Sequence, residues 1–135
     1  MSKIKILIVE DDPLMGRLYS KVFDIEGYDV VSAVDGEEGL LAVHKEIPTL
    51  ILLDVMMPKM NGLQLLERLK ADPTTKKIPV IMLTNLAGQA DAEAAIIKGA
   101  VKYIVKSEYE PKQVVNIVKE ILAGYTRDSV PEVTQ

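Results

Sequence analysis

Chemically active side chains stand at the ends of four apolar runs in this sequence. In chain order they are Glu10 and Asp11 after residues 4–9, Asp54 after residues 50–53, Thr84 closing residues 80–84, and Lys106 after residues 101–105. Short apolar runs bounded by turn residues are typical of strands buried on both faces of a parallel sheet. Because such sheets bind ligands at the carboxyl ends of their strands, we expect these groups to converge in one site.

The chemistry of this set is that of a phosphoryl-accepting site. Three carboxylates, those of Glu10, Asp11 and Asp54, would repel one another unless a cation lies among them. Carboxylates without histidine or cysteine favour Mg²⁺ or Mn²⁺ over zinc. Asp54 can act as a nucleophile and form an aspartyl phosphate. Thr84 and Lys106 can bind phosphoryl oxygens, so that the charge of the transferring group is spread over several partners.

Five strands alternating with five helices would position these groups. The expected strands cover residues 4–9, 28–34, 50–53, 80–84 and 101–105, and the expected helices begin at Pro13 and near Glu37, cover 62–71 and 91–98, and run from Pro111 to about Gly124. This alternation predicts an α/β fold in which right-handed βαβ units build a doubly wound, five-stranded parallel sheet. We expect residues 1–124 to form one domain and residues 125–135 a flexible C-terminal tail.

The composition narrows the class of protein. The chain has 135 residues, 48% of them hydrophobic and 27% charged, which is ordinary for one globular domain. Its net charge of −4 argues against direct binding to nucleic acid, which depends on lysine and arginine at phosphates. No apolar run is long enough to cross a membrane, and the absence of cysteine excludes disulfides. A cytoplasmic location is the default expectation.

The motifs around the site resemble the receiver domain of bacterial-type response regulators. The resemblance rests on Ile-Leu-Ile-Val-Glu-Asp-Asp at residues 6–12, Leu-Leu-Asp-Val-Met-Met-Pro at 52–58 and Tyr-Ile-Val-Lys at 103–106, and it extends from about Ile4 to Gly124. It implies a flavodoxin-like (βα)5 fold with strand order 2-1-3-4-5, the order of the chemotaxis member of that family. It also implies a signalling switch of a two-component phosphorelay.

The resemblance assigns roles in phosphoryl transfer. Asp54 would accept the phosphoryl group from a phosphohistidine on a sensor histidine kinase or a phosphotransfer protein. Asp11 would bind Mg²⁺ directly, Glu10 would act through metal-bound water, and Met56 would offer its backbone carbonyl. Lys106 would bind the phosphoryl group. The domain would catalyse only its own phosphorylation and autodephosphorylation, and would not be an enzyme in the usual sense.

The resemblance also implies a switch mechanism. Thr84 would move toward the phosphoryl group and Tyr103 would rotate inward behind it. The surface formed by the last two helices and the last strand would then change its preference for an unknown downstream protein, which is a shift in populations. The domain is expected to be a monomer or a phosphorylation-dependent dimer.

The sequence departs from the family pattern at positions beside the expected site. Ser107 stands where the family usually has proline after the lysine, and a non-proline cis peptide costs about 3 kcal/mol, so we expect a trans bond or a visibly strained one. Asn85 stands where a small residue is common, and it would narrow access or add a donor. Met56 and Leu86 are apolar, and we expect them to hinder attacking water and lengthen the phosphorylated lifetime.

Two other functions remain open from the residues alone. A Mg²⁺-dependent phosphoester hydrolase or nuclease of the toprim-like type also uses strand-end carboxylates, but typically as an Asp-x-Asp pair where this chain has only Asp54. A flavodoxin-like cofactor binder would need a first loop rich in glycine and hydroxyl groups, whereas residues 10–12 are acidic. His44, the single histidine, is expected to be a surface residue.

Overall fold

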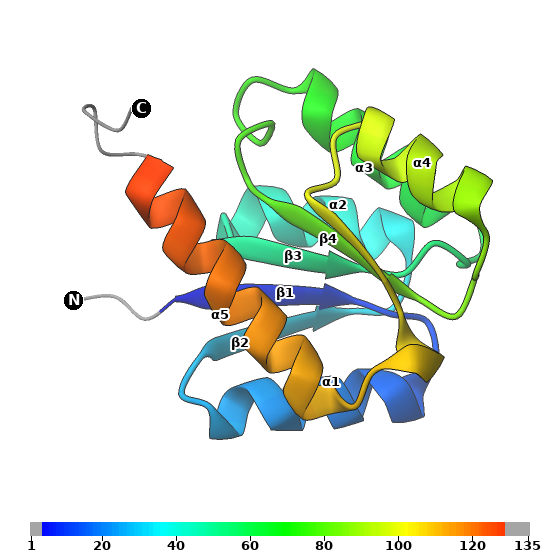
Figure 1. Cartoon of the computed structure of the whole chain (residues 1–135). Coiled ribbons are helices and arrows are strands. Elements are labelled where there is room, and N and C mark those ends of the chain that lie inside the picture. Colours follow the sequence, from blue (N-terminus) through cyan, green and yellow to red (C-terminus); the bar gives the residue numbers. More distant parts are fainter. Residues whose placement is uncertain (1–3, 129–135) are drawn as a thin grey trace.

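The computed structural model describes residues 4–128 of the chain (Figure 1). The elements in order are β1 (Lys5–Val9), α1 (Pro13–Ile25), β2 (Asp29–Ala33), α2 (Gly36–Glu46), β3 (Leu50–Leu53), α3 (Gly62–Ala71), β4 (Val80–Thr84), α4 (Gln89–Ile97), β5 (Lys102–Val105), the short 3-10 turn η1 (Lys106–Glu108) and α5 (Pro111–Asp128). Five strands and five α-helices therefore alternate, as the sequence predicts.

The five strands form one parallel sheet in the order β2-β1-β3-β4-β5, which confirms the predicted topology. The strand register brings the carboxyl ends together, since Val9 lies beside Leu53 and Thr84 lies beside Val105. The residues that follow β1, β3 and β5, and the residue that ends β4, therefore share one edge of the sheet. This edge is where the predicted site residues stand.

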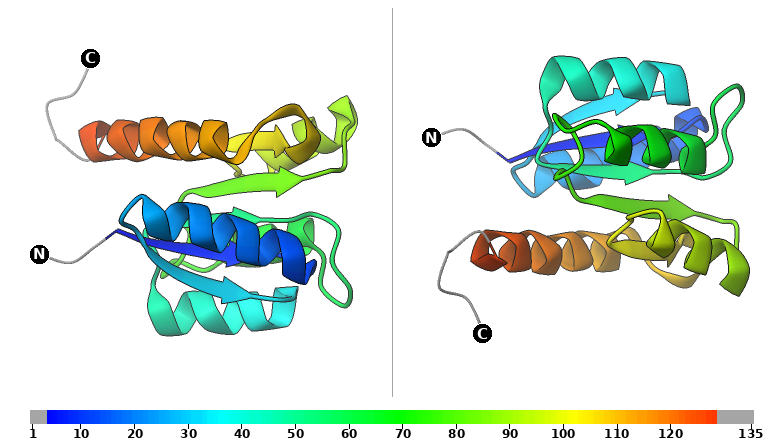
Figure 2. Two further views of the ribbon diagram at one scale, coloured as in Figure 1. Left: turned by 90° about the horizontal axis from the view of Figure 1, so that it is seen from below. Right: turned by 90° about the horizontal axis from the view of Figure 1, so that it is seen from above.

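Helices cover both faces of the sheet, because alternate strand residues supply two separate cores. One core joins β-strand residues such as Leu7 and Leu53 to α2, α3 and α4, and the other joins residues such as Ile6 and Leu52 to α1 and α5. The two views of Figure 2 show α1 in front of the sheet from one side and α3 in front from the other. The inner strands β3 and β4 are buried throughout.

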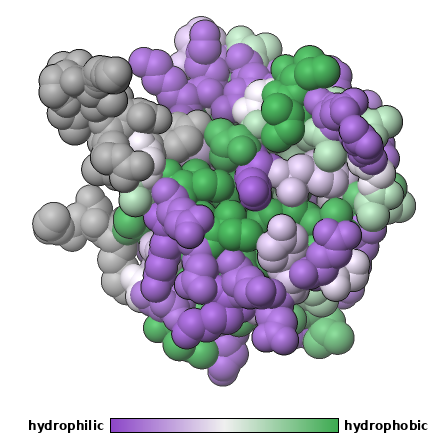
Figure 3. Space-filling model, in the orientation of Figure 1, coloured by the Kyte–Doolittle hydropathy of each residue, from purple (hydrophilic) through white to green (hydrophobic). Residues whose placement is uncertain are grey.

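The helices within residues 4–128 lack the features of a membrane span. In the part of the chain that the structure describes, every helix is too short or too polar to cross a bilayer. On the face shown in Figure 3, apolar patches are interrupted by hydrophilic side chains. The apolar residues are instead concentrated in the two cores on either side of the sheet.

The predicted end of the last helix near Gly124 is wrong, because α5 continues to Asp128. The two glycines that do stand at helix ends, Gly27 and Gly99, have φ values of +97° and +115°, whereas Gly124 is not in this left-handed region. A glycine in a helical conformation costs about 1 kcal/mol relative to alanine and does not stop a helix by itself. Residues 125–128 of the predicted tail are thus helical, and residues 129–135 lie outside the described residues.

Candidate functional site

The loop after β1 separates a structural acid from two acids of the site. Asp12 caps α1, its Oδ1 accepting a hydrogen bond from the Leu14 backbone N–H at 3.0 Å, and Pro13 opens the helix. Glu10 Oε2 accepts a hydrogen bond from the Asp12 N–H at 3.2 Å. This turn leaves Asp11 exposed beside Glu10, whose side chain is buried.

Three carboxylates meet at the carboxyl edge of the sheet. Glu10, Asp11 and Asp54 each offer an oxygen within 4.8 Å of the others. Asp54 is only 7% exposed, and its Oδ1 accepts a hydrogen bond from the Met56 N–H at 3.2 Å. An all-carboxylate set with an exposed member fits a hard divalent cation that keeps some of its water, such as Mg²⁺ or Mn²⁺.

Lys106 supplies a buried cation inside this acidic cluster. Its Nζ forms an ion pair with Glu10 Oε1 and lies 3.6 Å from Asp54 Oδ2. Burial raises the pKa of the Glu10 carboxyl to about 7, and the negative charge of Asp54 adds to this, while the hydrogen bond from Lys106 acts in the opposite direction. The sequence predicts convergence of these residues but does not reveal that Lys106 binds Glu10 more closely than Asp54.

Thr84 and Tyr103 both form hydrogen bonds to the backbone of Leu86, in the loop after β4. The fully buried Thr84 accepts a hydrogen bond from the Leu86 N–H at 3.2 Å. The Tyr103 hydroxyl donates to the Leu86 carbonyl at 2.6 Å. Partial burial, with the charges of Asp91 and Asp54, raises the pKa of Tyr103. The two side chains named as switch residues therefore share one loop residue as their partner.

Comparison with known proteins identifies the family of this chain. Residues 6–119 match the family described as "Response regulator receiver domain". The chain belongs to the response regulator receiver family. Receivers of this family are phosphorylation-activated switches of two-component systems, and the toprim-like alternative finds no support.

Individual relatives agree with this membership. A probable transcriptional regulator, ycf27, of Porphyridium aerugineum is 38% identical over 122 residues, which are 90% of this chain and 49% of that protein. The chain thus spans about half the length of the curated relatives of this kind that it matches. A CheY-like receiver domain protein from Methanospirillum hungatei JF-1 has a TM-score of 0.86 at 31% identity, covering 94% of this chain and 99% of that one.

A third similar structure is that of a protein complex. The CheX–CheY–BeF3–Mg²⁺ complex of Borrelia burgdorferi has a chain similar to this receiver, with a TM-score of 0.81 at 28% identity, covering 87% of this chain and 88% of that one. The CheY-type fold with strand order 2-1-3-4-5 is therefore shared with proteins of solved structure.

The departures from the family pattern lie around this receiver's site. No cis peptide bond occurs in the described part of the chain, so the Lys106–Ser107 bond is trans, as expected. Asn85 is exposed. Met56 is 60% exposed and, with Asp11, borders a surface hollow of about 380 Å³. The effect of Met56 and Leu86 on the phosphorylated lifetime stays a prediction.

Sequence reasoning missed two glycines and one ion pair. A side chain on Gly62 would place its Cβ 2.1 Å from the Asp54 carbonyl oxygen, and one on Gly36 would place it 2.3 Å from the Met60 carbonyl oxygen. Both glycines look in the sequence like ordinary turn or helix-start residues. His44 is exposed, as predicted, but its Nε2 pairs with Asp72 Oδ2 at 3.0 Å. The contacts of Gly36 and His44 join segments far apart in the chain, and the contact of Gly62 depends on how the loop after Asp54 closes, so the residue types alone contain no signal for them.

Proposed function

We propose that Asp54 accepts a phosphoryl group from a phosphohistidine on a sensor histidine kinase or phosphotransfer protein, in a reaction that depends on Mg²⁺ or Mn²⁺. The observation that carries this proposal is the meeting of three carboxylates within 4.8 Å of one another, with the buried Lys106 beside them. No other group of described residues combines a buried nucleophile with a possible metal site.

In the proposed step a carboxylate oxygen of Asp54 attacks the phosphorus atom of the phosphoimidazole. A P–O bond forms, the P–N bond breaks, and its electron pair stays on the imidazole nitrogen, which then takes up a proton. Lys106 Nζ, 3.6 Å from Asp54 Oδ2, is near enough to pair with a phosphoryl oxygen after transfer. Burial of Lys106 and Asp54 limits screening by water, which strengthens this attraction.

The residues proposed to hold the ion are Asp11, Asp54 and the backbone carbonyl of Met56, with Glu10 acting through water. When bound, Mg²⁺ would neutralise charge on the phosphoryl oxygens. Asp11 is exposed beside the buried Asp54, so an ion entering from solvent can contact both, and the Glu10 carboxylate, already paired with Lys106, can act through a water molecule. The Borrelia burgdorferi complex named above contains Mg²⁺ together with BeF3, which supports an analogous site in this receiver.

The proposed switch starts at Thr84. Its hydroxyl, which now accepts a hydrogen bond from the Leu86 N–H, would turn to donate to the phosphoryl group. Loss of this contact would remove one of the two side-chain hydrogen bonds to the Leu86 backbone. Tyr103, which donates the other to the Leu86 carbonyl, would then rotate inward. The surface of α4, β5 and α5 would bind a downstream protein differently in the two states, because phosphorylation stabilises one arrangement more than the other.

The wider setting is also part of the proposal. The receiver domain would comprise residues 1–124 together with the continuation of α5 to Asp128. It would act in the cytoplasm as a monomer or a phosphorylation-dependent dimer, and bind neither nucleic acid nor membrane directly. Its chemistry would be limited to its own phosphorylation and autodephosphorylation. The ycf27 relatives are about twice as long as the matched segment, so the functions of their remaining residues belong to those proteins.

A small-molecule phosphodonor tests the central step. The protein is incubated with acetyl phosphate and Mg²⁺, and its intact mass is measured. We expect a gain of one phosphoryl group that disappears in Asp54→Asn and in EDTA. Asp24→Asn, an exposed acid on α1, is the matched control and should be labelled like the parent. Label that persists in Asp54→Asn, or no label in the parent, would contradict the proposal.

A further inference from the structure

The first turn of α2 touches the loop that carries the predicted metal ligand. This β3–α3 loop (residues 55–61) connects Asp54 to α3. Gly36, the first residue of α2, is buried, and a Cβ at this position would lie 2.3 Å from the carbonyl oxygen and 2.8 Å from the Cβ of Met60. The nearest atoms belong to the backbone and base of Met60, so no side-chain rotation can make room.

The start of α2 is itself fixed. Asp35 Oδ1 accepts a hydrogen bond from the Glu38 N–H at 2.8 Å, and Glu38 Oε1 accepts one from the Val34 N–H at 3.0 Å. The first bond caps the helix and the second ties its first turn to the end of the preceding segment, so together they hold the helix entry. One turn further, a Cβ at Gly39 would lie 3.0 Å from a methyl group of Val9, so α2 is already in close contact with the end of β1. A movement of α2 away from the loop would therefore break these hydrogen bonds and disturb its packing against β1.

The loop is also fixed at its two ends. The Gly62 N–H donates to the Val55 carbonyl at 2.9 Å, which closes the base of the loop. Asn61 caps α3 and exchanges hydrogen bonds of 2.9 Å with Gln64. A displacement of Met60 must consequently be taken up by residues 56–59, which lie between the fixed Val55 and Asn61, and within this stretch the Met56 N–H donates to Asp54 Oδ1.

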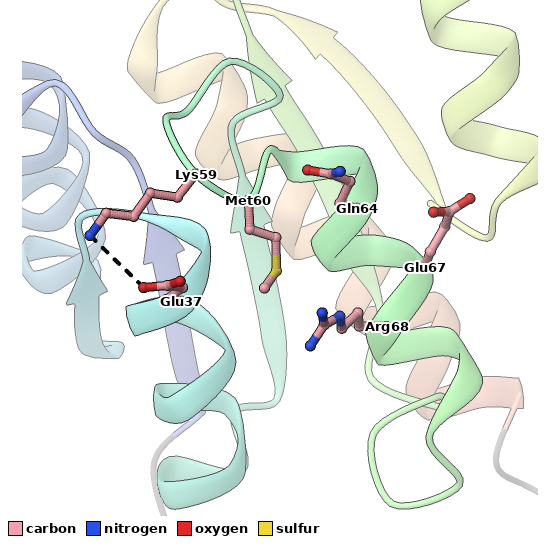
Figure 4. A pocket seen from close by; sticks show the side chains of 6 residues that line it. All are labelled: Glu37, Lys59, Met60, Gln64, Glu67 and Arg68. Atoms are coloured by element: carbon pink, nitrogen blue, oxygen red, sulfur yellow. Dashed lines mark ion pairs between the residues drawn. The ribbon is translucent and has the colours of Figure 1, made fainter.

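Lys59 indicates that the loop is held under constraint. Its φ of +67° lies in the left-handed region that favours glycine, which a lysine adopts when its surroundings hold it there. Its Nζ lies 3.9 Å from Asp35 Oδ2 and 3.8 Å from Glu37 Oε1, both at the start of α2 (Figure 4). Figure 4 shows Lys59 extending toward Glu37 at the start of α2. Both residues line a hollow between α2 and α3 with a volume of about 510 Å³. Loop and helix are thus linked by charge as well as by backbone contact.

We propose that Gly36 is a positioning residue for the cation site. Its lack of a side chain lets the start of α2 support the Met60 carbonyl, and this support fixes the loop so that Asp54 and the Met56 carbonyl stand ready for the ion. The inference rests on the proposed function of the site. Any side chain at position 36 would push Met60 away and shift Met56, and the affinity for Mg²⁺ would fall.

The test measures Mg²⁺ affinity of Gly36→Ala by calorimetry and follows the amide signals of residues 55–61 by NMR in metal-free buffer. We expect the affinity to fall by about tenfold, the scale found for residues that orient metal ligands, and the loop amide signals to shift before any metal is added. Gly124→Ala is the matched control, because a Cβ there meets no atom within 4 Å, and it should bind Mg²⁺ like the parent.

The outcomes separate this inference from the proposed function. A parent protein that binds no Mg²⁺ would overturn both. A parent that binds Mg²⁺ and a Gly36→Ala variant that binds it equally well would overturn the positioning role alone. If Gly36→Ala does not fold, the double variant Gly36→Ala/Lys59→Gly is used, because glycine at position 59 lets the loop backbone adjust to the new side chain. Its affinity for Mg²⁺ is compared with that of Lys59→Gly alone. We expect about tenfold weaker binding in the double variant, and equal binding would overturn the inference.

Discussion

Two neighbouring connections at the site are built in opposite ways. The β3–α3 loop leads into a helix with a complete cap, in which Asn61 and Gln64 each bind the other's backbone N–H at 2.9 Å. The β4–α4 connection leads into α4 from Gly88, which provides no side-chain hydrogen bond to the helix start. Both follow buried strands that end in site residues, so the difference lies in what comes after the strand.

The two helices differ in burial as well. Helix α3 buries four of its residues, Gly62, Leu65, Leu66 and Leu69, whereas α4 buries only Ala95. The ion pair that holds α4 lies at its far end, where Lys98 Nζ is 2.7 Å from Glu67 Oε2. The segment that follows Asp54 is therefore fixed, whereas the helix that follows Thr84 is weakly attached at the end nearest the site. Elements that move in switching are drawn from such low-stability regions.

The largest expected effect tests this difference in packing. Leu66→Ala removes a fully buried side chain from α3 and should lower the free energy of unfolding by about 3 kcal/mol. Ile97→Ala on α4 removes a side chain that is 85% exposed and should change it by less than about 0.5 kcal/mol. Urea denaturation measures both. Similar losses for the two variants would contradict the comparison.

The second prediction concerns the repulsion among the three carboxylates that precede the well-packed helix α3. In metal-free buffer, Asp54→Asn should raise the free energy of unfolding by about 1 kcal/mol, because it relieves repulsion among the three carboxylates while the Lys106–Glu10 pair remains. Thermal melting in EDTA measures this. Asp24→Asn again serves as the control, and a lower melting temperature for Asp54→Asn would mean that its attraction to Lys106 outweighs the repulsion.

The same variant should alter the pH dependence of stability. The pKa of Glu10 is raised from 4.5 to about 7, chiefly by burial and also by Asp54. A carboxyl whose pKa is higher in the folded state binds its proton more tightly there, so stability falls as the pH rises from 4.5 to about 7. Removal of the Asp54 charge by Asp54→Asn should make this decrease in the free energy of unfolding smaller, as measured by denaturation across the same pH range. An unchanged slope would show that burial alone raises the pKa.

The residue pattern predicts the alternation of strands and helices and the residues that meet at the site, for a physical reason, whereas the strand order is predicted by the family resemblance. Strand ends are marked by apolar runs, and parallel strands must bring those ends to one edge, so Glu10, Asp54, Thr84 and Lys106 could be placed without coordinates. It does not predict which acid Lys106 binds, because both acids lie within reach and the choice depends on side-chain rotamers and burial.

Other features could not be predicted because they depend on contacts between distant segments. The contact of Gly36 with Met60 exists only once α2 has packed beside the β3–α3 loop. The helical state of residues 125–128 depends on Gly124 keeping a helical conformation, which its residue type does not decide. Local patterns predict elements reliably in this chain, whereas their exact ends and mutual contacts are set by packing.

The fourth prediction exchanges the capping of the two helices. Asn61→Ala should cost about 1 kcal/mol, since it removes the acceptor for the Gln64 N–H. Gly88→Ser should add a cap that α4 lacks and stabilise it by a few tenths of a kcal/mol, about the usual gain over glycine. The new Cβ would lie 2.8 Å from Asp91 Oδ2, the end of a side chain that can turn aside. Hydrogen exchange of residues 89–93 should slow in Gly88→Ser, and unchanged exchange would mean that the missing cap does not cause the weakness of α4.

The smallest expected effect concerns the ion pair between His44 on α2 and Asp72 at the end of α3. His44 Nε2 lies 3.0 Å from Asp72 Oδ2, and this contact, with the one to the Leu40 carbonyl, raises the pKa of His44 above 6.5. Because the folded-state pKa is raised, the pair stabilises the fold fully below pH 6.5, and this stabilisation is lost as the pH rises through the folded-state pKa. His44→Gln should therefore remove a small decline in melting temperature between about pH 6 and pH 8, which Lys45→Gln should retain. As His44 is the single histidine, one ring signal in an NMR titration reports its pKa directly, and a value at or below 6.5 would show that the pair does not form in solution.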